Sequence, residues 1–291
     1  MKRLLLPAVG LLGALVLYGG NCSRARVESM EALNRGVLAA RQKQYVEAIE
    51  ELEKATAIDP TNEQAFWNLA LVHMETQKLD AARADLAKAI AVNPQRGLYH
   101  YQLGTVNQQQ QRWDDAKSAF EAAIRVDQAL FKAYFKLGQV LEEMDDQQNA
   151  LRRYTEAVQR GPRFLPAYSA LGRLYADLGY LDQAVQVLQS ALQVAHRGTE
   201  EEADIHNILG SVYQQQRKYD EAVTQFREAL NIVPSMHDAL FSLGWTYWLQ
   251  DNRENARIYL KKFVDTAGPR ARQDYVTAAN QRLIELAEAP Q

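Results

Sequence analysis

The chain has 291 residues, a formal net charge of −3 and a single cysteine. One cysteine excludes an intramolecular disulfide even in an oxidising compartment. The slight acidic excess gives no support for nucleic acid as a partner, because nucleic-acid-binding proteins usually present a basic patch.

The first 22 residues carry the pattern of an export segment. A short basic start, Met1-Lys2-Arg3, is followed by an apolar run over residues 4–18 and then by Gly19-Gly20-Asn21-Cys22. A basic start, an apolar run and small residues are typical of a secretory signal, here residues 1–21. The run is short for a membrane-spanning helix, which needs about 20 apolar residues.

Cys22, directly after the apolar run, resembles the cysteine of bacterial lipoprotein signals, although Asn21 and Gly19 depart from the usual residues. The resemblance implies a lipid (palmitate) anchor on Cys22; an uncleaved signal-anchor and ordinary secretion are the alternatives. Ser23 follows the cysteine. In lipoproteins of this type an aspartate at that position would favour retention in the inner membrane, so the resemblance implies a periplasm-facing protein of the outer membrane. Anchoring in the inner membrane is the alternative. Loss of the signal leaves 31 basic and 36 acidic residues, a net charge of about −5.

After a polar tether predicted over residues 22–28, small residues recur at a spacing of 34, with one step of 38. The first series is Gly36, Ala70, Gly104, Gly138, Gly172, Gly210 and Gly244, and the second is Ala48, Ala82, Ala116, Ala150, Ala184, Ala222 and Ala256. A fixed period in this range indicates a repeat array. The predicted units are 29–62, 63–96, 97–130, 131–164, 165–202, 203–236 and 237–268.

Each unit is predicted to be two amphipathic helices joined by a polar turn. In the fourth unit, apolar residues lie on one helical face in both halves: Tyr134, Leu137, Gly138 and Leu141, then Ala150, Tyr154 and Ala157. Gly161-Pro162 ends the second helix because proline lacks a backbone donor. The small residues let the two helices approach closely.

This pattern resembles the tetratricopeptide repeat, with its period of 34, leucine–small pair, tyrosine, alanine and proline. The resemblance implies an all-α fold, a right-handed superhelical solenoid of seven helix-turn-helix repeats with a C-terminal capping helix. Such units are stabilised by their neighbours. The cap is predicted in residues 269–291, with its apolar residues on one side: Tyr275, Val276, Ala279, Leu283 and Leu286.

Four added residues interrupt the period at 195–202. Gly198 is predicted to cap the preceding helix, and Thr199 with Glu202 reads as a capping box. We expect the first helix of the sixth unit to start a turn early; a plain surface loop is the alternative. The glutamine clusters at 107–111 and 214–216 are predicted to be solvated turns.

The predicted binding surface is the concave side, which first helices line in this family. A contiguous exposed apolar patch usually marks a binding site, and the expected ligand is an amphipathic helix or extended peptide. The predicted groove residues are Trp67, Leu71, Met74, Tyr101, Thr105, Phe135, Gln139 and Arg173. Burial of the aromatic residues between adjacent repeats is the alternative. A second apolar stripe is Phe241, Trp245 and Trp248, either buried under the cap or a partner site.

No catalytic constellation is present in the sequence. The five histidines have no metal-ligand spacing, and His73 takes the place of a packing tyrosine. We therefore expect no enzyme activity, no cofactor and no metal site. The sequence predicts a protein-binding scaffold anchored to the outer membrane, similar to the tetratricopeptide lipoproteins that help to assemble type IV pilus secretins. A scaffold for peptidoglycan enzymes or another envelope machine is the alternative, and the sequence does not identify the partner or the oligomeric state.

Overall fold

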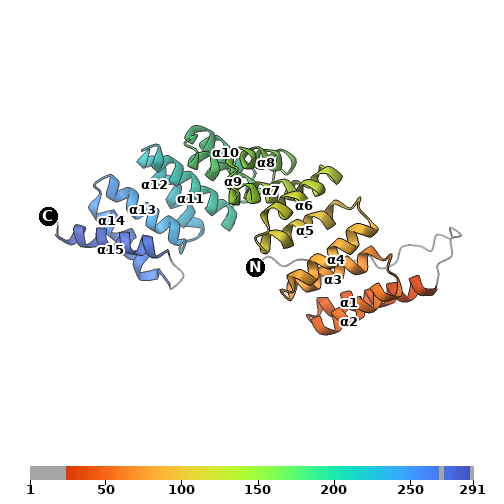
Figure 1. Cartoon of the computed structure of the whole chain (residues 1–291). Coiled ribbons are helices and arrows are strands. Elements are labelled where there is room, and N and C mark those ends of the chain that lie inside the picture. The colour runs from red at the N-terminus through yellow and green to blue at the C-terminus, as the bar shows by residue number, and fades with distance from the viewer. Residues whose placement is uncertain (1–23, 269–271, 289–291) are drawn as a thin grey trace. The chain divides into compact units, whose positions relative to one another are not determined.

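The computed structural model describes residues 24–268 and 272–288. Over these residues the chain forms fifteen α-helices and no strand, which confirms the all-α prediction. The helices belong to two compact units, one ending at Asp145 with α1–α7 and one beginning at Asp146 with α8–α15. Within each unit, successive helices pack side by side in chain order (Figure 1).

The first unit consists of α1 (Arg24–Arg41), α2 (Tyr45–Ile58), α3 (Glu63–Glu75), α4 (Leu79–Val92), α5 (Gly97–Gln109), α6 (Trp113–Val126) and α7 (Phe131–Glu143). The second unit consists of α8 (Gln147–Arg160), α9 (Leu165–Asp177), α10 (Leu181–Val194), α11 (Glu200–Gln215), α12 (Tyr219–Ile232), α13 (His237–Leu249), α14 (Arg253–Thr266) and α15 (Gln273–Glu288).

The hairpins within each unit turn through a residue in the left-handed backbone region. In the α5–α6 turn this residue is Gln111, with φ of 57°. The turn is closed by hydrogen bonds from Gln111 N to Gln108 O (3.0 Å) and from Arg112 N to Asn107 O (2.9 Å). The same position holds glycine in only one hairpin, at Gly179, so the other hairpins adopt this turn with a residue that prefers it less.

The recurring small residue lies where the two helices of a hairpin come closest. A Cβ atom added to Gly104 of α5 would stand 2.7 Å from ring carbons of Phe120 on α6. Four other glycines face a large side chain of the second helix in the same way, and an added Cβ would stand 2.6–2.9 Å from it. The pairs are Gly36 with Leu52, Gly172 with Leu188, Gly210 with Phe226 and Gly244 with Leu260. The period of 34 in the sequence therefore reflects a steric requirement that is repeated along the array.

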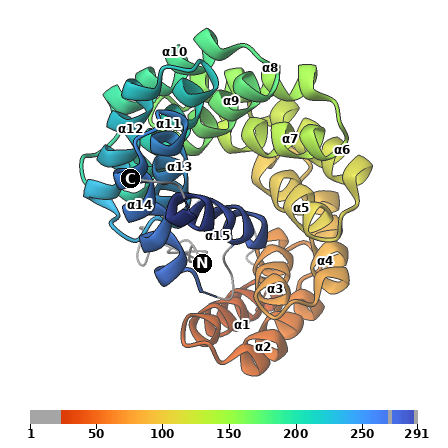
Figure 2. The same cartoon turned by 90° about the vertical axis from the view of Figure 1, so that its left-hand side faces the viewer.

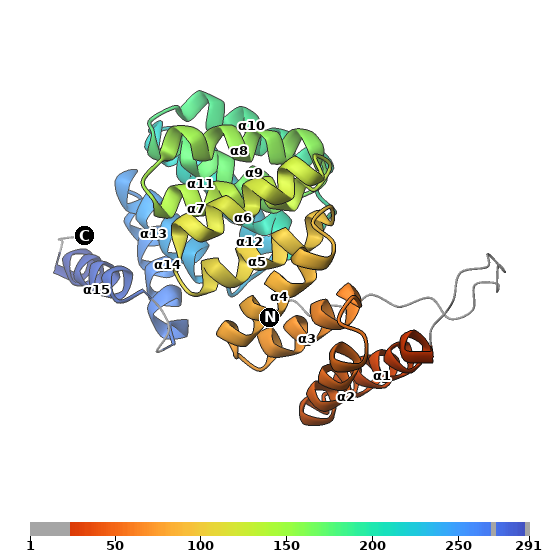
Figure 3. The same cartoon turned by 45° about the vertical axis from the view of Figure 1, so that its right-hand side comes forward.

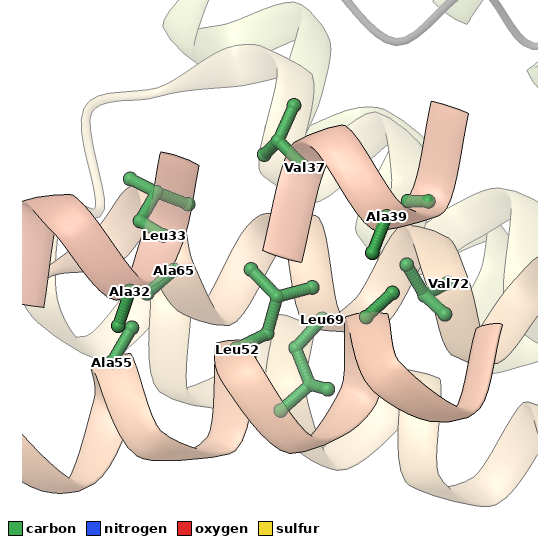
Figure 4. Packing of buried hydrophobic residues seen from close by; sticks show 11 residues of the cluster. Ala32, Leu33, Val37, Ala39, Leu52, Ala55, Ala65, Leu69 and Val72 are labelled. Atoms are coloured by element: carbon green, nitrogen blue, oxygen red, sulfur yellow. The ribbon is translucent and has the colours of Figure 1, made fainter. Parts of the chain in front are cut away.

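The first repeat is well packed, although its sequence departs from the pattern. Ala32 and Ala39 stand where larger apolar residues are expected, and both are buried against α2 and α3 (Figure 4). Ser29 donates to Ala55 O (2.8 Å) and accepts from Asn62 Nδ2 (2.9 Å), which joins the first repeat to the start of α3.

The predicted tether is shorter than expected, because residues 24–28 are helical and form the first turns of α1. The predicted early start of the sixth unit is confirmed: α11 has 16 residues, against 13 in α9. The Thr199 side chain accepts from Glu202 N (3.3 Å), which is one of the two bonds of a capping box, and the Glu202 carboxylate accepts from Gly198 N (2.6 Å). The prediction that Gly198 caps the preceding helix is wrong, since α10 ends at Val194.

The last helix, α15, packs on α14 and touches α13 (Figure 2). It has the register of a first helix of one more repeat, since Tyr275 lies 34 residues after Phe241. The face on which a second helix would pack carries Asp274, Thr277 and Gln281, all exposed. This polar face closes the C-terminal end of the array, as a solenoid requires.

Candidate protein-interaction groove

The apolar part of the predicted groove lies on α3, and its side chains are buried. Trp67 is 8% exposed, and Leu71 and Met74 are each 4% exposed. The Trp67 ring lies 6.0 Å from the ring of Tyr99 on α5, the first helix of the next repeat. The Trp67 indole N–H has no hydrogen-bond partner. These three residues therefore act in packing in this structure, which matches the alternative of burial between repeats.

The next two first helices present residues that are only half-buried. Tyr101 and Thr105 lie on α5, and Phe135 and Gln139 lie on α7. The Tyr101 ring stands 5.8 Å from that of Phe120, so the hairpin partner supports it from behind. These four residues are the accessible part of the predicted groove in the first unit.

Hydrogen bonds and burial fix the polar groups of this half-buried row. Thr105 Oγ1 donates to Tyr101 O (3.0 Å), and Lys136 Nζ donates to Gln139 Oε1 (2.9 Å). Burial lowers the pKa of Lys136 and raises the pKa of Tyr101. The row thus combines two aromatic rings with positioned hydroxyl and amide groups, a surface suited to a peptide with both apolar and polar side chains.

Arg173 belongs to the second unit, where it is exposed on α9 and has a favourable charge interaction with Asp204 of α11. Two polar side chains of α11 form hydrogen bonds. Ser211 Oγ donates to the backbone oxygen of Asn207 (3.1 Å), and Gln214 Nε2 donates to Thr246 Oγ1 on α13 (2.8 Å). The side chains named here on α9 and α11 are therefore polar, unlike the apolar groove residues on α3.

The second apolar stripe is covered by α15. Tyr275 stacks on Phe241 with ring centroids 4.1 Å apart and an interplanar angle of 14°. The Arg282 guanidinium lies over Trp248 at 4.2 Å and over Trp245 at 5.2 Å. Phe241 is buried, and Trp245 and Trp248 are half-buried, in agreement with the alternative of burial under the cap.

His73 is buried and its Nδ1 lies 2.8 Å from Asp85 Oδ2 across the α3–α4 hairpin. Lys88 lies 3.8 Å from the other carboxylate oxygen. Burial raises the pKa of Asp85, partly offset by the hydrogen bond to His73. The packing interpretation of His73 missed this partner, which a histidine and an aspartate on facing helices could have indicated. In the described part of the chain, no group of three or more His, Cys, Asp or Glu side chains is placed to hold a metal ion.

Sequence reasoning also missed a set of hydrogen bonds between repeats. Glutamines at the ends of first helices donate from Nε2 to an aspartate Oδ1 at the start of the preceding second helix. The pairs are Gln110–Asp80 (3.0 Å), Gln216–Asp182 (2.8 Å) and Gln250–Asp220 (2.7 Å). The prediction of solvated turns did not include this role for Gln110 and Gln216, which link neighbouring repeats, and it is wrong for Asn107, which is buried within α5.

Stacked helical hairpins with a row of half-buried side chains on their first helices define a helical-repeat scaffold for protein interaction. The chain belongs to the tetratricopeptide repeat family: models of this family match residues 39–104, 101–162, 164–235 and 207–272. The sequence matches no curated relative.

Three solved structures illustrate the likeness. YrrB, described as a tetratricopeptide protein with an unusual peptide-binding site, is 24% identical with a TM-score of 0.55, covering 66% of this chain and 97% of its own. MamA is 24% identical with a TM-score of 0.54, covering 57% of this chain and 91% of its own. PilF of Pseudomonas aeruginosa is 16% identical with a TM-score of 0.60, covering 75% of this chain and 97% of its own. At these identities the likeness shows the fold.

The predictions for Cys22 and for the apolar run of residues 4–18 concern residues outside the described ranges. Within the described ranges, no helix is both long enough and apolar enough to cross a bilayer.

Proposed function

We propose that the chain is a non-enzymatic scaffold, held by a lipid on Cys22 at the periplasmic face of the outer membrane, that helps to assemble an envelope complex. The position of Cys22 after the apolar run supports the anchor. The resemblance to secretin-assembling tetratricopeptide lipoproteins favours a type IV pilus secretin as the complex.

The observation that carries the binding proposal is the half-buried row on α5 and α7, formed by Tyr101, Thr105, Phe135 and Gln139. The aromatic rings offer apolar contact area at a low cost in side-chain entropy, since each has only two rotatable side-chain angles. The partner segment is an amphipathic helix or an extended peptide laid along this row. Trp67, Leu71 and Met74 pack in one cluster with Tyr99 and Val106, which lie on the same helix as Tyr101 and Thr105.

Site-specific photo-cross-linking in cells tests the groove. A photoreactive amino acid replaces Phe135, and a matched control replaces Tyr180, which is 51% exposed in the α9–α10 turn. We expect a cross-linked product from position 135 and none from position 180, with a secretin subunit identified by mass spectrometry. Equal cross-linking from both positions contradicts the groove, and cross-links to peptidoglycan enzymes replace the secretin by the alternative partner.

The anchor is tested separately. Cys22→Ala should move the protein from the membrane fraction to the soluble periplasm while the helical content is kept. Retention of the variant in membranes would show that lipidation is the wrong account of the export segment.

A further inference from the structure

The first helix extends beyond its repeat. α1 has 18 residues, whereas α3, α5, α7, α9 and α13 have 13 each. The excess lies at the N-terminal end, because the repeat begins at Ser29 and the helix begins at Arg24. All five residues of this overhang, 24–28, are exposed. Figure 3 shows the first turns of α1 leading away from the α1–α2 hairpin, in the darkest red.

The helix begins two residues after Cys22, with no glycine or proline between them. Two extended residues span at most about 7 Å, and the three helical residues to Val27 add about 4.5 Å. Val27 therefore lies within about 12 Å of the anchor residue. The headgroup region on each side of a bilayer is several ångströms thick, about 5–7 Å from the difference between total and hydrocarbon thickness. A lipid on Cys22 thus keeps the overhang within reach of the membrane interface.

The side chains of the overhang suit that environment. Val27 is 48% exposed, and Met30 on the adjoining turn is 36% exposed. The Arg24 side chain is 93% exposed and pairs with Glu28 on the helix surface at 2.7 Å. An apolar side chain beside an exposed guanidinium matches an interface in which acyl chains lie under anionic headgroups.

We propose that the overhang of α1, residues 24–28, lies against the phospholipid bilayer with Val27 in the interface. The inference rests on the proposed lipid anchor. It deepens that function, because the overhang belongs to the same helix as the first repeat, so its contact with the bilayer sets the orientation of that repeat relative to the membrane.

The test places one fluorescent label on the mature protein. A lipid blocks the thiol of Cys22, the only native cysteine, so Val27→Cys provides a single reactive site. Val46→Cys is the matched control, a valine that is 74% exposed on α2 beyond the far turn of the hairpin. Each labelled protein is reconstituted into phosphatidylethanolamine–phosphatidylglycerol vesicles that contain lipids carrying a quencher in the upper acyl chain.

We expect strong quenching at position 27 and quenching no greater than background at position 46. Equal quenching at the two positions, or none at either, overturns the inference. Disulfide-linked dimers of Val27→Cys without quenching overturn it as well, by showing that a second copy of the chain covers this end.

Failure of the anchor is recognised independently, because mass spectrometry of the purified protein reports the lipid on Cys22. If the lipid is absent, the lipid-anchor proposal fails. The two labels are then read in a Cys22→Ser background, where the contrast between positions 27 and 46 still decides whether α1 touches the bilayer.

Discussion

Replacing Gly104 with alanine adds one methyl group at the closest approach of α5 and α6. The new carbon would stand 2.7 Å from Cδ1 and Cε1 of Phe120 and 2.9 Å from its Cγ. Non-bonded carbon atoms prefer a separation of about 3.5–4.0 Å. Phe120 is fully buried, so its ring cannot swing into solvent, and the two helices must separate.

The magnitude follows from two opposing terms. Overpacking a close-packed core typically costs about 1–3 kcal/mol. Replacing glycine by alanine inside a helix returns about 0.5–1 kcal/mol. We therefore expect Gly104→Ala to lower the free energy of unfolding by about 1–2 kcal/mol, since the steric term is the larger.

A second substitution tests whether the ring of Phe120 is the cause. The second repeat already holds alanine at the glycine position, Ala70, and there the facing residue is Leu86, with both side chains fully buried. Phe120→Leu should therefore make Gly104→Ala less harmful, and the double variant should lose less stability than the sum of the two single variants.

The assay is urea unfolding followed by far-ultraviolet circular dichroism, with amide hydrogen exchange to localise the loss to α5 and α6. Gln109→Ala, at an exposed position of α5, controls for helix propensity alone. If Gly104→Ala is neutral or stabilising, or if the double variant is additive, the period of small residues does not report tight packing.

Three further predictions concern turns, charge and the links between repeats. Gln111→Gly should raise the free energy of unfolding by up to about 1 kcal/mol, because glycine adopts the left-handed backbone region of the turn more readily. Gly179→Ala, at φ of 80°, should lower the free energy of unfolding by about 1 kcal/mol for the same reason. Urea unfolding checks both, and changes of the same sign in the two variants would contradict this account of the turns. Burial raises the pKa of the Asp85 carboxyl group, so this group binds a proton more readily in the folded chain than in the unfolded chain. The protonated carboxyl group therefore contributes stability in acid, and this contribution is lost as the pH rises through the pKa of Asp85 in the folded chain. Asp85→Asn has no carboxyl group to titrate here, so its free energy of unfolding should rise relative to that of the native chain as the pH rises through the acid range. Urea unfolding at several pH values measures this difference, and a fall of the variant relative to the native chain would contradict the direction of the pKa shift. Gln250→Ala should cost about 0.5–1.5 kcal/mol through the lost bond to Asp220, and adding Asp220→Ala should cost little more in a double-mutant cycle.

The helices could be predicted from the sequence because packing repeats with the chain. Gly104 must be small for the same reason as Gly36 or Gly244, so each repeat independently reports the same steric requirement. The α1 overhang was not predicted, because Arg24-Ala25-Arg26-Val27-Glu28 is polar enough to resemble a linker. It contains no helix breaker, and the Arg24–Glu28 pair at i, i+4 supports helix, so the helix of the first repeat extends back through it.

The exposure of groove residues was harder to predict, because a side chain's neighbours decide it. Trp67 occupies a position that faces the groove in this family, yet it packs against Tyr99. Tyr99 stands where the second, fourth, fifth and seventh units have alanine, and that large residue is the signal that could have indicated a filled joint between these repeats. Burial raises the pKa of Tyr99 to about 12, as expected for a phenol enclosed in such a joint.

A core residue, Phe120, contacts the accessible row, and this determines how groove variants should be interpreted. Phe120 faces Gly104 on one side and lies 5.8 Å from Tyr101 on the other. A change that moves Phe120 therefore moves a groove ring without touching the groove, and Tyr101→Ala removes support from a core ring. Phe135, which lies two helices further along the chain on α7, is the cleaner position for a binding test. Loss of partner binding in Phe135→Ala with unchanged unfolding assigns the effect to recognition, whereas a parallel loss of stability assigns it to packing.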